Sequence, residues 1–477
     1  MIEQRRKDSY QTIGRCPVLT YQVLLERIQR ISPVTVALIS STPVPSAAVA
    51  TDFRADKALM TRTTENFPNP VKSKAWTAVM RCLAGLAVVT VTTALAVVLT
   101  ALSNAMPQLL PSNESQPYEA YSSIPQFLRW LGSQTTEAQF FKTELGGLGM
   151  LLGGWVAHIA WKRGRRWAGF PISYGTGLWP WAVGSALLGL LLSDLAWGWT
   201  SIATGTSQPT FVPFVSVSPA VVLVYGAGWS VAVTGAVLGA ALTTPIALLA
   251  VNFVCHPLGL PAVTGSVTGM WGGALIAFLL ARRLPWMPPP GGPFFADRPD
   301  EAGQQSVPAS ASTASSRHGP GWVVRRVLAD FTEAPFYGNE IAAVGLIAGT
   351  VLAYVLNLLT PVQGSGLLPA VLTAQALTAT IGILLYHRRW ADAGSYPTFV
   401  PVVSVAPATV LAYGPTVQAI VVGAVLGALA GPPLAAQISK RLPPDFHPFI
   451  GNVLSMTICT LTIIPLLSIL PGFTAVT

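Results

Sequence analysis

The feature that most constrains this chain is an apolar segment interrupted by prolines that occurs twice. Residues 209–226 and 397–414 are identical at 14 of 18 aligned positions, and each carries three prolines at spacings of four and six. Proline lacks an amide donor and breaks a regular helix, so backbone groups within each segment lose their helical partners. We therefore expect two copies of one unit, each with a broken apolar element inside it.

The similarity continues on both sides of these segments. At the same offset of 188 residues a Gly-Ala-Val-Leu-Gly-Ala sequence repeats, and further upstream a Thr-Glu-Ala sequence repeats at an offset of 196. The matched pairs are 235–240 with 423–428, and 136–144 with 332–340. The repeated unit then covers roughly residues 124–286 and 325–477.

Composition places both copies in a membrane. Only 10% of the residues are charged, 51% are hydrophobic and the mean hydropathy is +0.54, whereas a soluble chain carries about 25% charged residues. The net charge of +9 comes from Lys and Arg in short loops, which is typical of cytoplasmic loops and unlike the single basic surface of a nucleic-acid-binding protein. A soluble enzyme, a nucleic-acid partner and a disordered scaffold are thereby excluded.

We expect an all-α polytopic membrane protein with about 11 transmembrane segments, one N-terminal anchor plus two five-segment repeats with Pro-broken third segments. The apolar runs lie at about 144–161, 178–200, 210–228, 229–250 and 262–281 in the first copy, and at about 340–359, 366–386, 397–413, 416–437 and 449–470 in the second. The expected domains are a polar, largely disordered cytosolic extension (1–75), the anchor (76–103), an extracytosolic loop (104–142), repeat 1 (143–281), a Pro/Ser-rich cytosolic linker (282–330) and repeat 2 (331–477).

The parity of the segments predicts inversion. Five crossings are an odd number, so the second copy would sit in the membrane with the opposite orientation. With the N-terminus in the cytosol of a plasma-membrane protein, the basic clusters near 162–166, 282–283, 387–389 and 440–441 all fall on the cytosolic side. Whether each third segment crosses or re-enters stays open.

This organisation resembles the five-plus-five inverted-repeat transporters and facilitators, in which substrate binds near the midplane on discontinuous helices. The prolines free backbone groups, and the hydroxyl, phenol and amide side chains near them donate and accept hydrogen bonds. We predict a site for a small polar solute, neutral, zwitterionic or anionic. Its residues would be Pro209, Thr210, Pro213, Ser216, Ser218, Tyr225, Gln375, Pro397, Thr398, Pro401, Ser404 and Tyr413.

Ionisable side chains inside the membrane are candidates for coupling or gating. They are Asp194, Glu144, Glu340, His256 and His447, with helix capping, interfacial placement and loop hydrogen bonds as the alternative roles. Two small-xxx-small pairs predict close helix packing that holds the copies together. They are Gly235 with Gly239 and Gly423 with Gly427.

The leading hypothesis is a carrier of a small solute, and the alternatives are a channel-like facilitator and a membrane scaffold or assembly factor. The sequence contains no G-x-x-x-x-G-K-[ST], no H-E-x-x-H and no C-x-x-C, and its four cysteines are scattered. We therefore expect no enzyme activity, no cofactor and no metal site. The expected partners are the lipid bilayer and the solute, and a homo-oligomer stays open.

Overall fold

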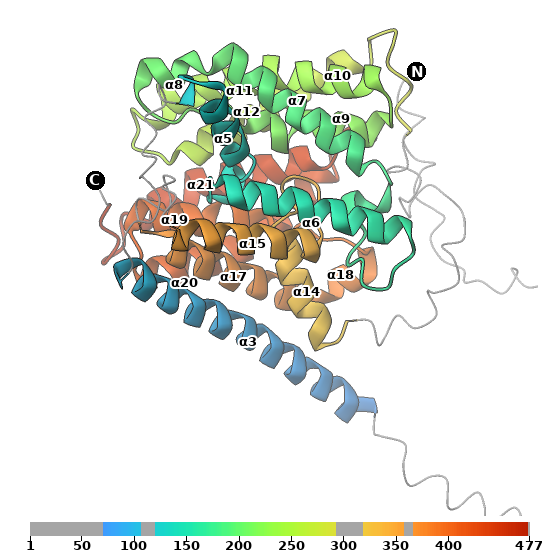
Figure 1. Ribbon diagram of the computed structural model, residues 1–477. Coiled ribbons are helices and arrows are strands. Elements are labelled where there is room, and N and C mark those ends of the chain that lie inside the picture. The colour runs from blue at the N-terminus through green and yellow to red at the C-terminus, as the bar shows by residue number, and fades with distance from the viewer. Residues whose placement is uncertain (1–69, 106–119, 292–317, 357–365, 476–477) are drawn as a thin grey trace, which may run out of the picture. The chain divides into compact units, whose positions relative to one another are not determined.

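The computed structural model describes residues 70–105, 120–291, 318–356 and 366–475, and these residues form helices and loops without a strand (Figure 1). Residues 1–69 of the expected cytosolic extension lie outside the described residues. The all-helical class expected from the sequence is confirmed for the described part of the chain.

Seven described helices are long and apolar enough to cross a membrane, so the chain is a multi-pass membrane protein in contact with lipid. The seven spans are Trp76–Leu102, Trp179–Trp197, Trp229–Cys255, Ala262–Ala281, Leu368–Leu385, Val417–Ser439 and Phe449–Leu467. Three shorter apolar helices, Val212–Tyr225, Glu340–Val355 and Val400–Tyr413, accompany them. The expected count of about 11 is thus met in part.

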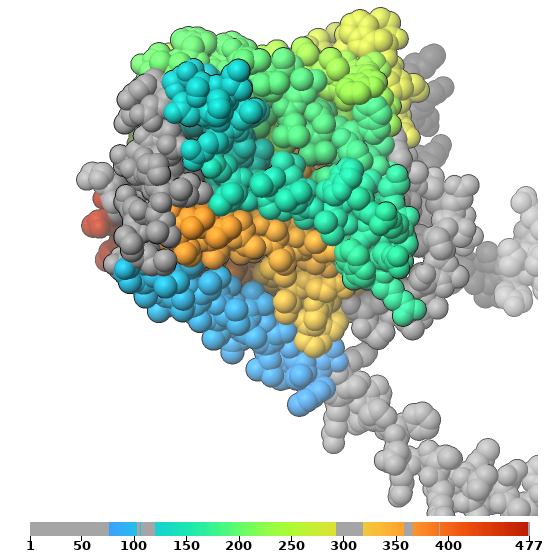
Figure 2. Space-filling model, viewed as in Figure 1, coloured from blue at the N-terminus to red at the C-terminus, as the bar shows by residue number. Residues whose placement is uncertain are grey.

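The N-terminal anchor is helix α3, Pro70–Ala105. It packs mainly on α17 (Leu368–Leu385) and α14 (Pro320–Asp330) of the second copy, and Figure 2 shows it along the edge of that copy. Most of its large apolar side chains are exposed, including Val79, Leu86 and Val91. This face fits the hydrocarbon of a bilayer.

The elements of the two copies follow one another in the same order. The first copy contains α5 (Ile124–Gln134), η1 (Glu137–Gln139), α6 (Glu144–Lys162), η2 (Ile172–Gly175), α7 (Trp179–Trp197), α8 (Trp199–Thr204), η3 (Val212–Val215) and α9 (Val217–Tyr225). It continues with α10 (Trp229–Leu238), η4 (Gly239–Thr243), α11 (Thr244–Ala250) and η5 (Val251–Cys255), which form one continuous span, and ends with α12 (Ala262–Ala281). The second contains α14, α15 (Glu340–Val355), α17, α18 (His387–Ala393), η7 (Val400–Val403), α19 (Val405–Tyr413), α20 (Val417–Ser439) and α21 (Phe449–Leu467).

Both proline-rich segments break at the same position. A 3-10 turn ends at Val215 in one and at Val403 in the other, and an α-helix starts after one intervening residue, Ser216 or Ser404. The backbone angles are φ −139°, ψ −112° at Ser216 and φ −145°, ψ −94° at Ser404. The two segments of shared sequence therefore have the same local structure.

Helices α6 and α15 lie side by side in the middle of the molecule (Figure 1) and touch through glycines. A Cβ on Gly149 would lie 2.1 Å from the Gly345 carbonyl oxygen, and a Cβ on Gly345 would lie 2.1 Å from that of Gly149. On one side of this point Gly153 approaches the Ile341 carbonyl, and on the other Gly349 approaches the Leu145 carbonyl. Contacts that run up one helix and down the other mean that the two helices cross antiparallel.

The stretch expected to be a linker contains a helix instead. Residues 292–317 lie outside the described residues, but α14 begins at Pro320 and buries Val323 and Val327 against its neighbours. These valines are four residues apart and share one helix face. Because residues 282–330 are rich in Pro, Ser and Ala as a whole, their average composition does not indicate this short amphipathic helix.

Candidate functional site

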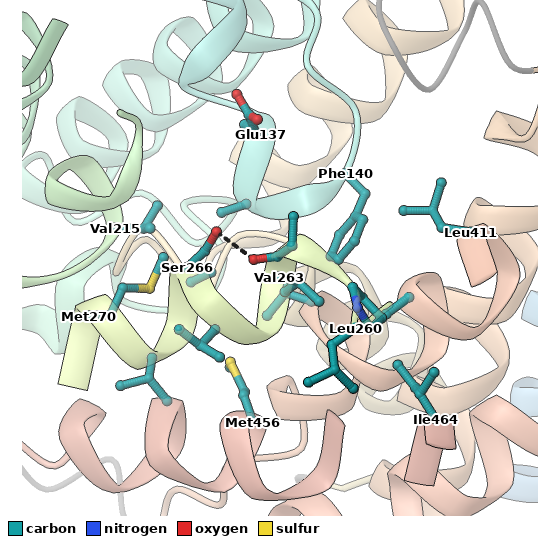
Figure 3. Close-up of a pocket in the computed structure, with 18 of the residues that line it drawn as sticks. Glu137, Phe140, Val215, Leu260, Val263, Ser266, Met270, Leu411, Met456 and Ile464 are labelled. Atoms are coloured by element: carbon teal, nitrogen blue, oxygen red, sulfur yellow. Dashed lines mark hydrogen bonds between the residues drawn. The ribbon is translucent and has the colours of Figure 1, made fainter. Parts of the chain in front are cut away.

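A cavity of about 700 Å³ lies where the two copies meet, between the loops before α6 and α15 and the helices α12 and α21 (Figure 3). Its walls are mainly apolar, and many lining residues occupy matched positions of the duplicated sequence. The matched pairs are Glu137 and Glu333, Phe140 and Phe336, Phe211 and Phe399, and Val215 and Val403, and α12 and α21 add Met270 and Met456. Each copy contributes one half of this set.

Two loops that share the Thr-Glu-Ala sequence carry the glutamates and two of the phenylalanines. Phe140 and Phe336 have left-handed backbones, with φ of 68° and 65°, which are uncommon outside glycine. In each loop a threonine hydroxyl donates to the carbonyl oxygen seven residues on and accepts from the amide of that same residue: Thr136 pairs with Thr143, and Thr332 with Asn339. These bonds hold each loop in a tight curve with its phenylalanine turned toward the cavity.

The same loops start α6 and α15. The N-caps Thr143 and Asn339 accept hydrogen bonds from the first free amides of their helices. Glu144 pairs with Arg129 of α5 at 2.9 Å, and Glu340 pairs with Arg325 of α14 at 2.6 Å. The two predicted glutamates thus sit at matched helix starts and are held by matched arginines.

Both helices begin close to their crossing point. Glu144 precedes Gly149 by five residues, a distance of about 7.5 Å along a helix, and Glu340 precedes Gly345 by the same distance. The Thr-Glu-Ala loops therefore interrupt the chain at the level where α6 and α15 cross. These loops, in addition to the proline-rich segments, are discontinuous elements next to the cavity.

The two cavity glutamates are each paired with a buried cation. Glu137 Oε2 lies 3.1 Å from Lys142 Nζ, which also donates to Ser207 Oγ and sits 4.3 Å from the Trp130 ring centroid. On the opposite wall Glu333 accepts from Arg326 at 2.6 Å. The Glu137–Lys142 pair is formally neutral, whereas Arg326 is shared between Glu333 and Asp330.

Helices α12 and α21 form the long wall of the cavity (Figure 3). Thr264 of α12 donates to Thr460 of α21 at 3.0 Å, and Met270 and Met456 reach into the space between the copies. Past one end of this wall Arg282 lies 3.6 Å from Asp445. A cavity of this volume and apolar character matches the usual size of small-molecule sites.

Most hydroxyls predicted to bind solute are occupied elsewhere. Ser216 and Ser404 donate to the carbonyls of Val212 and Val400 in their own segments, and Ser218 faces the packed side toward Gly239. None of these hydroxyls lines the cavity, because an apolar helix interior leaves a serine its own backbone carbonyl as the nearest acceptor. The same segments contribute Phe211, Val215, Phe399 and Val403 to the cavity instead.

Of the remaining residues predicted to bind the solute, some are packed inside the protein and one lines the cavity. Gln375 is buried and donates to the carbonyls of Gln139 and Val402, and Tyr225 packs on Phe278. Pro209, Pro213, Pro397 and Pro401 lie outside the cavity lining, with Pro213 against Gly239 and Pro401 against Gly427. Tyr413 alone lines the cavity among the twelve predicted residues, and its hydroxyl donates to the Ile464 carbonyl.

Matched threonines mark a polar cluster behind the cavity wall in each copy. Thr210 contacts the buried carboxylate of Asp194 at 3.0 Å, and Thr398 faces the buried carboxylate of Asp330. Asp330 is bound by Arg326 at 2.6 Å. The two acids come from different elements, α7 in the first copy and α14 in the second.

The two predicted histidines occupy different places. His256 is exposed at the end of η5, whereas His447 is buried just before α21, with its ring 5.2 Å from Phe336 and 5.6 Å from Phe449. The shared His-Pro sequence therefore does not place the rings at equivalent points of α12 and α21.

The four predicted packing glycines lie at close contacts, but within each copy. A Cβ on Gly235 would lie 2.8 Å from the Ser218 carbonyl oxygen, and a Cβ on Gly423 would lie 2.7 Å from Thr409. Gly239 and Gly427 likewise pack on Pro213 and Pro401. The contacts between the copies come from α6 with α15 and from α12 with α21 instead.

The described residues contain no cluster of three His, Cys, Asp or Glu side chains that could hold a metal ion. The cavity residues that the sequence analysis missed are those of the Thr-Glu-Ala loops, although their repetition at an offset of 196 was the available signal. Comparison with protein-family models, with curated proteins and with solved structures gives no match. Function must therefore be inferred from the cavity and the elements that build it.

Proposed function

We propose that this protein is a membrane transporter that carries a small amphipathic solute through the cavity between its two copies. The observation that carries the proposal is the set of matched residues from both copies around one cavity of about 700 Å³. A site shared by two structural repeats, beside discontinuous helices, is where many transporters bind substrate.

The crossing of α6 and α15 supports an inverted arrangement of the copies. Equivalent residues meet reciprocally, Gly149 with Gly345, and the contacts continue in antiparallel order. A two-fold axis perpendicular to both helices produces this pattern. If α6 crosses the bilayer, that axis lies in the membrane plane and the copies have opposite orientations.

With α6 counted as a crossing beside α7, the span Trp229–Cys255 and α12, the first copy has four, and because an inverted arrangement needs an odd number, the broken third element would supply the fifth. Its 3-10 turn and α-helix, with 4 and 9 residues, cover about 22 Å. Residues 209–211 before it form a bend and a turn, with the Thr210 amide donating to the Gln208 carbonyl, so the 3-10 turn and α-helix alone are shorter than the hydrocarbon, which is about 30 Å thick. The matched residues of the second copy turn in the same way, with the Thr398 amide donating to the Tyr396 carbonyl.

We also propose that the N-terminus of this plasma-membrane protein lies in the cytosol. Five crossings per copy would bring the basic ends of α6, α12, α17 and α20 to one side of the membrane. Lys and Arg near the ends of membrane spans favour the cytosolic side.

The lining narrows the solute class. Aromatic, Met and Val side chains favour an apolar body, while the Glu137–Lys142 and Glu333–Arg326 pairs offer one polar contact at each side. Because Glu137 is paired with Lys142, and Glu333 shares Arg326 with Asp330, the lining favours a neutral or zwitterionic amphipathic solute over a strongly anionic one. The expectation of a merely polar solute is refined accordingly.

A flux assay tests the proposal directly. The purified full-length chain would be placed in liposomes and the entry of dansyl-alanine, ethidium and a nitrophenyl glycoside measured, representing an anionic, a cationic and a neutral amphipathic probe. We expect faster entry of at least one probe than into empty liposomes. Met270→Trp, which fills the cavity, should abolish this flux, and Leu429→Trp on an exposed face should retain it. Equal entry with and without protein for all three probes would overturn the proposal.

A labelling experiment tests the inversion separately. With the four native cysteines replaced, single cysteines at Thr206 and Ser395 would follow the matched glycines Gly205 and Gly394 in exposed loops. We expect a membrane-impermeant maleimide to label position 206 from outside intact cells and position 395 only after permeabilisation. Labelling of both from the same side would mean that the copies are parallel.

A further inference from the structure

A carboxylate without a neutralising cation lies near the C-terminal end of α7. Asp194 is 1% exposed, and its Oδ1 accepts four hydrogen bonds. The donors are the Tyr121 hydroxyl (3.1 Å), Trp130 Nε1 (3.3 Å), Gln134 Nε2 (2.7 Å) and the Thr210 hydroxyl (3.0 Å). The other oxygen, Oδ2, is buried and has no hydrogen-bond partner among the described residues.

Among the described residues, no charged side chain contacts Asp194. Tyr121 is the one titratable group in contact, Lys142 lies over the Trp130 ring and pairs with Glu137, and Arg129 pairs with Glu144. The neighbouring α8, η3, α10, η4 and α11 contain no ionisable residue, and α9 contains only Tyr225, which packs on Phe278. Burial without a cation disfavours the ionised carboxylate, while four donated hydrogen bonds favour it.

The surrounding atoms fit a proton better than a metal ion. Cations such as Na⁺ and Ca²⁺ need several oxygen lone pairs pointing inward. Here the indole and amide nitrogens point N–H groups at Asp194, and neither nitrogen has a lone pair to offer. A proton needs only the free Oδ2.

The hydroxyl of Thr210 can change its hydrogen-bond acceptor with the protonation state of Asp194, and Thr210 is next to the cavity wall. Its hydroxyl has one hydrogen and two acceptors in reach, Gln134 Oε1 at 2.8 Å and Asp194 Oδ1 at 3.0 Å. A negative Asp194 attracts this hydrogen, whereas a neutral one releases it to Gln134. The next residue, Phe211, forms part of the cavity wall.

The second copy holds its acid in the corresponding cluster differently. Gln134 corresponds to Asp330 and Trp130 to Arg326 at the offset of 196. There the buried acid Asp330 is bound by Arg326 at 2.6 Å, and Arg326 also binds Glu333. Asp194, by contrast, is held by uncharged hydrogen-bond donors.

We infer that Asp194 is a proton-binding site, which takes a proton from water onto Oδ2 and returns it to water, and that Thr210 transmits this change to the cavity wall at Phe211. The coupling to solute movement rests on the proposed function, whereas the proton site does not. An inward proton gradient would then change the rate of solute entry.

The first test follows the proton itself, without any solute. Infrared difference spectra of the full-length protein in lipid nanodiscs, recorded between acidic and alkaline buffers, should show the carbonyl stretch of a protonated carboxyl group that disappears as the pH rises. In a protein that carries Asp330→Asn, which removes the second buried acid with an unpartnered oxygen, Asp194→Asn should remove this band. Asp445→Asn, an acid in a loop beside Arg282, should keep it. An Asp330→Asn protein without the band, or one that retains it after Asp194→Asn is added, would overturn the inference.

A second variant keeps Asp194 in place and guards against misfolding of Asp194→Asn. Thr210→Val is close to isosteric and removes one donor to the ionised carboxylate. We expect the midpoint of the band to move to higher pH by about one unit. An unchanged midpoint would exclude the role of Thr210, since a merely structural threonine would not alter the titration.

The coupling is tested with whichever of the three probes enters the liposomes. A proton gradient should alter its entry at least threefold in the wild type and leave Asp194→Asn unaffected. Flux that ignores the gradient in the wild type would overturn the coupling. Failure of every probe to enter, with the infrared band present, would instead remove the transport proposal and leave the proton site standing.

Discussion

The two copies meet at two interfaces of opposite character. Between α6 and α15 the contact is made by backbone, because glycines at the crossing leave no room for a Cβ. Between α12 and α21 the contact is made by long side chains such as Met270 and Met456, around a cavity of about 700 Å³. Both interfaces join equivalent helices, so the difference lies in the side chains that separate them.

The difference shows where this architecture can change shape. Two helices that pack glycine against a backbone carbonyl fit together in one relative position. Sliding one helix along the other would force backbone atoms together or open a void. Methionine side chains are unbranched and adaptable, and they can repack around a solute. We therefore expect mutations at the glycine contact to reduce stability and mutations at the cavity wall to act mainly on flux.

The largest effect on stability is expected from Gly149→Ala. Its new Cβ would lie 2.1 Å from the Gly345 carbonyl oxygen, so the helices must separate along their whole contact. We expect a loss of about 3 kcal/mol, measured as a lower unfolding temperature in detergent.

The matched control is Gly184→Ala in α7, where a Cβ has nothing within 4 Å. There alanine should be neutral or raise stability by about 0.5 kcal/mol through its better helix propensity. Equal unfolding temperatures for the two variants would mean that the close crossing of α6 and α15 does not exist.

The next prediction compares the loss of stability at a closely packed methionine with the loss at a methionine that lines the cavity. Met150 of α6 is completely buried in the hydrophobic core, whereas Met456 lines the cavity. Met150→Ala should cost about 3 kcal/mol, because it creates a new void in packed surroundings. Met456→Ala should cost about 1 kcal/mol, because it enlarges a space already present.

Thermal unfolding of both variants in the same detergent measures the difference in stability. In the flux assay we expect the opposite ranking of the two variants. Met456→Ala should change probe entry more than Met150→Ala does. A larger stability loss for Met456→Ala would indicate that the α12 and α21 interface is as closely packed as the glycine contact.

Much of this fold could be predicted from hydropathy. The apolar run at 262–281 coincides with α12, and the runs at 416–437 and 449–470 lie within two or three residues of α20 and α21. These helices are recognisable because each is apolar over its whole length. The short amphipathic α14 was hidden, because it follows a proline- and serine-rich stretch whose composition dominates the region.

The cavity was harder to predict than the helices around it. Proline spacing correctly located the broken segments, but it does not determine which face of a broken segment lines a cavity. Ser216 and Ser404 turn to their own backbone, and Phe211 and Phe399 take the cavity side. The repeat of the Thr-Glu-Ala loops is visible in the sequence. Their position level with the crossing of α6 and α15 follows only from the structure.

The helix caps next to the tight interface give a smaller effect. Thr143→Ala removes the acceptor for the Gly146 amide at the start of α6 and should cost about 1 kcal/mol. Asn339→Ala should cost more, about 2 kcal/mol, because Asn339 also donates to the carbonyls of Ala168 and Phe170. Unfolding temperatures measure both losses, and Thr143→Ser should restore the wild-type value. A smaller loss at Asn339 than at Thr143 would contradict the assigned hydrogen bonds.

The smallest effect is expected from the ion pairs beside these caps. Arg129 and Glu144 are 42% and 27% exposed, so a double-mutant cycle with Arg129→Gln and Glu144→Gln should give a coupling energy below about 0.5 kcal/mol that fades in high salt. The matched pair Arg325 and Glu340 should couple more strongly, by about 1 kcal/mol, because Glu340 is only 11% exposed and also accepts from the Phe170 amide. Equal coupling in the two cycles would mean that solvent reaches both helix starts alike. The start of α15 would then be held no more firmly than the start of α6.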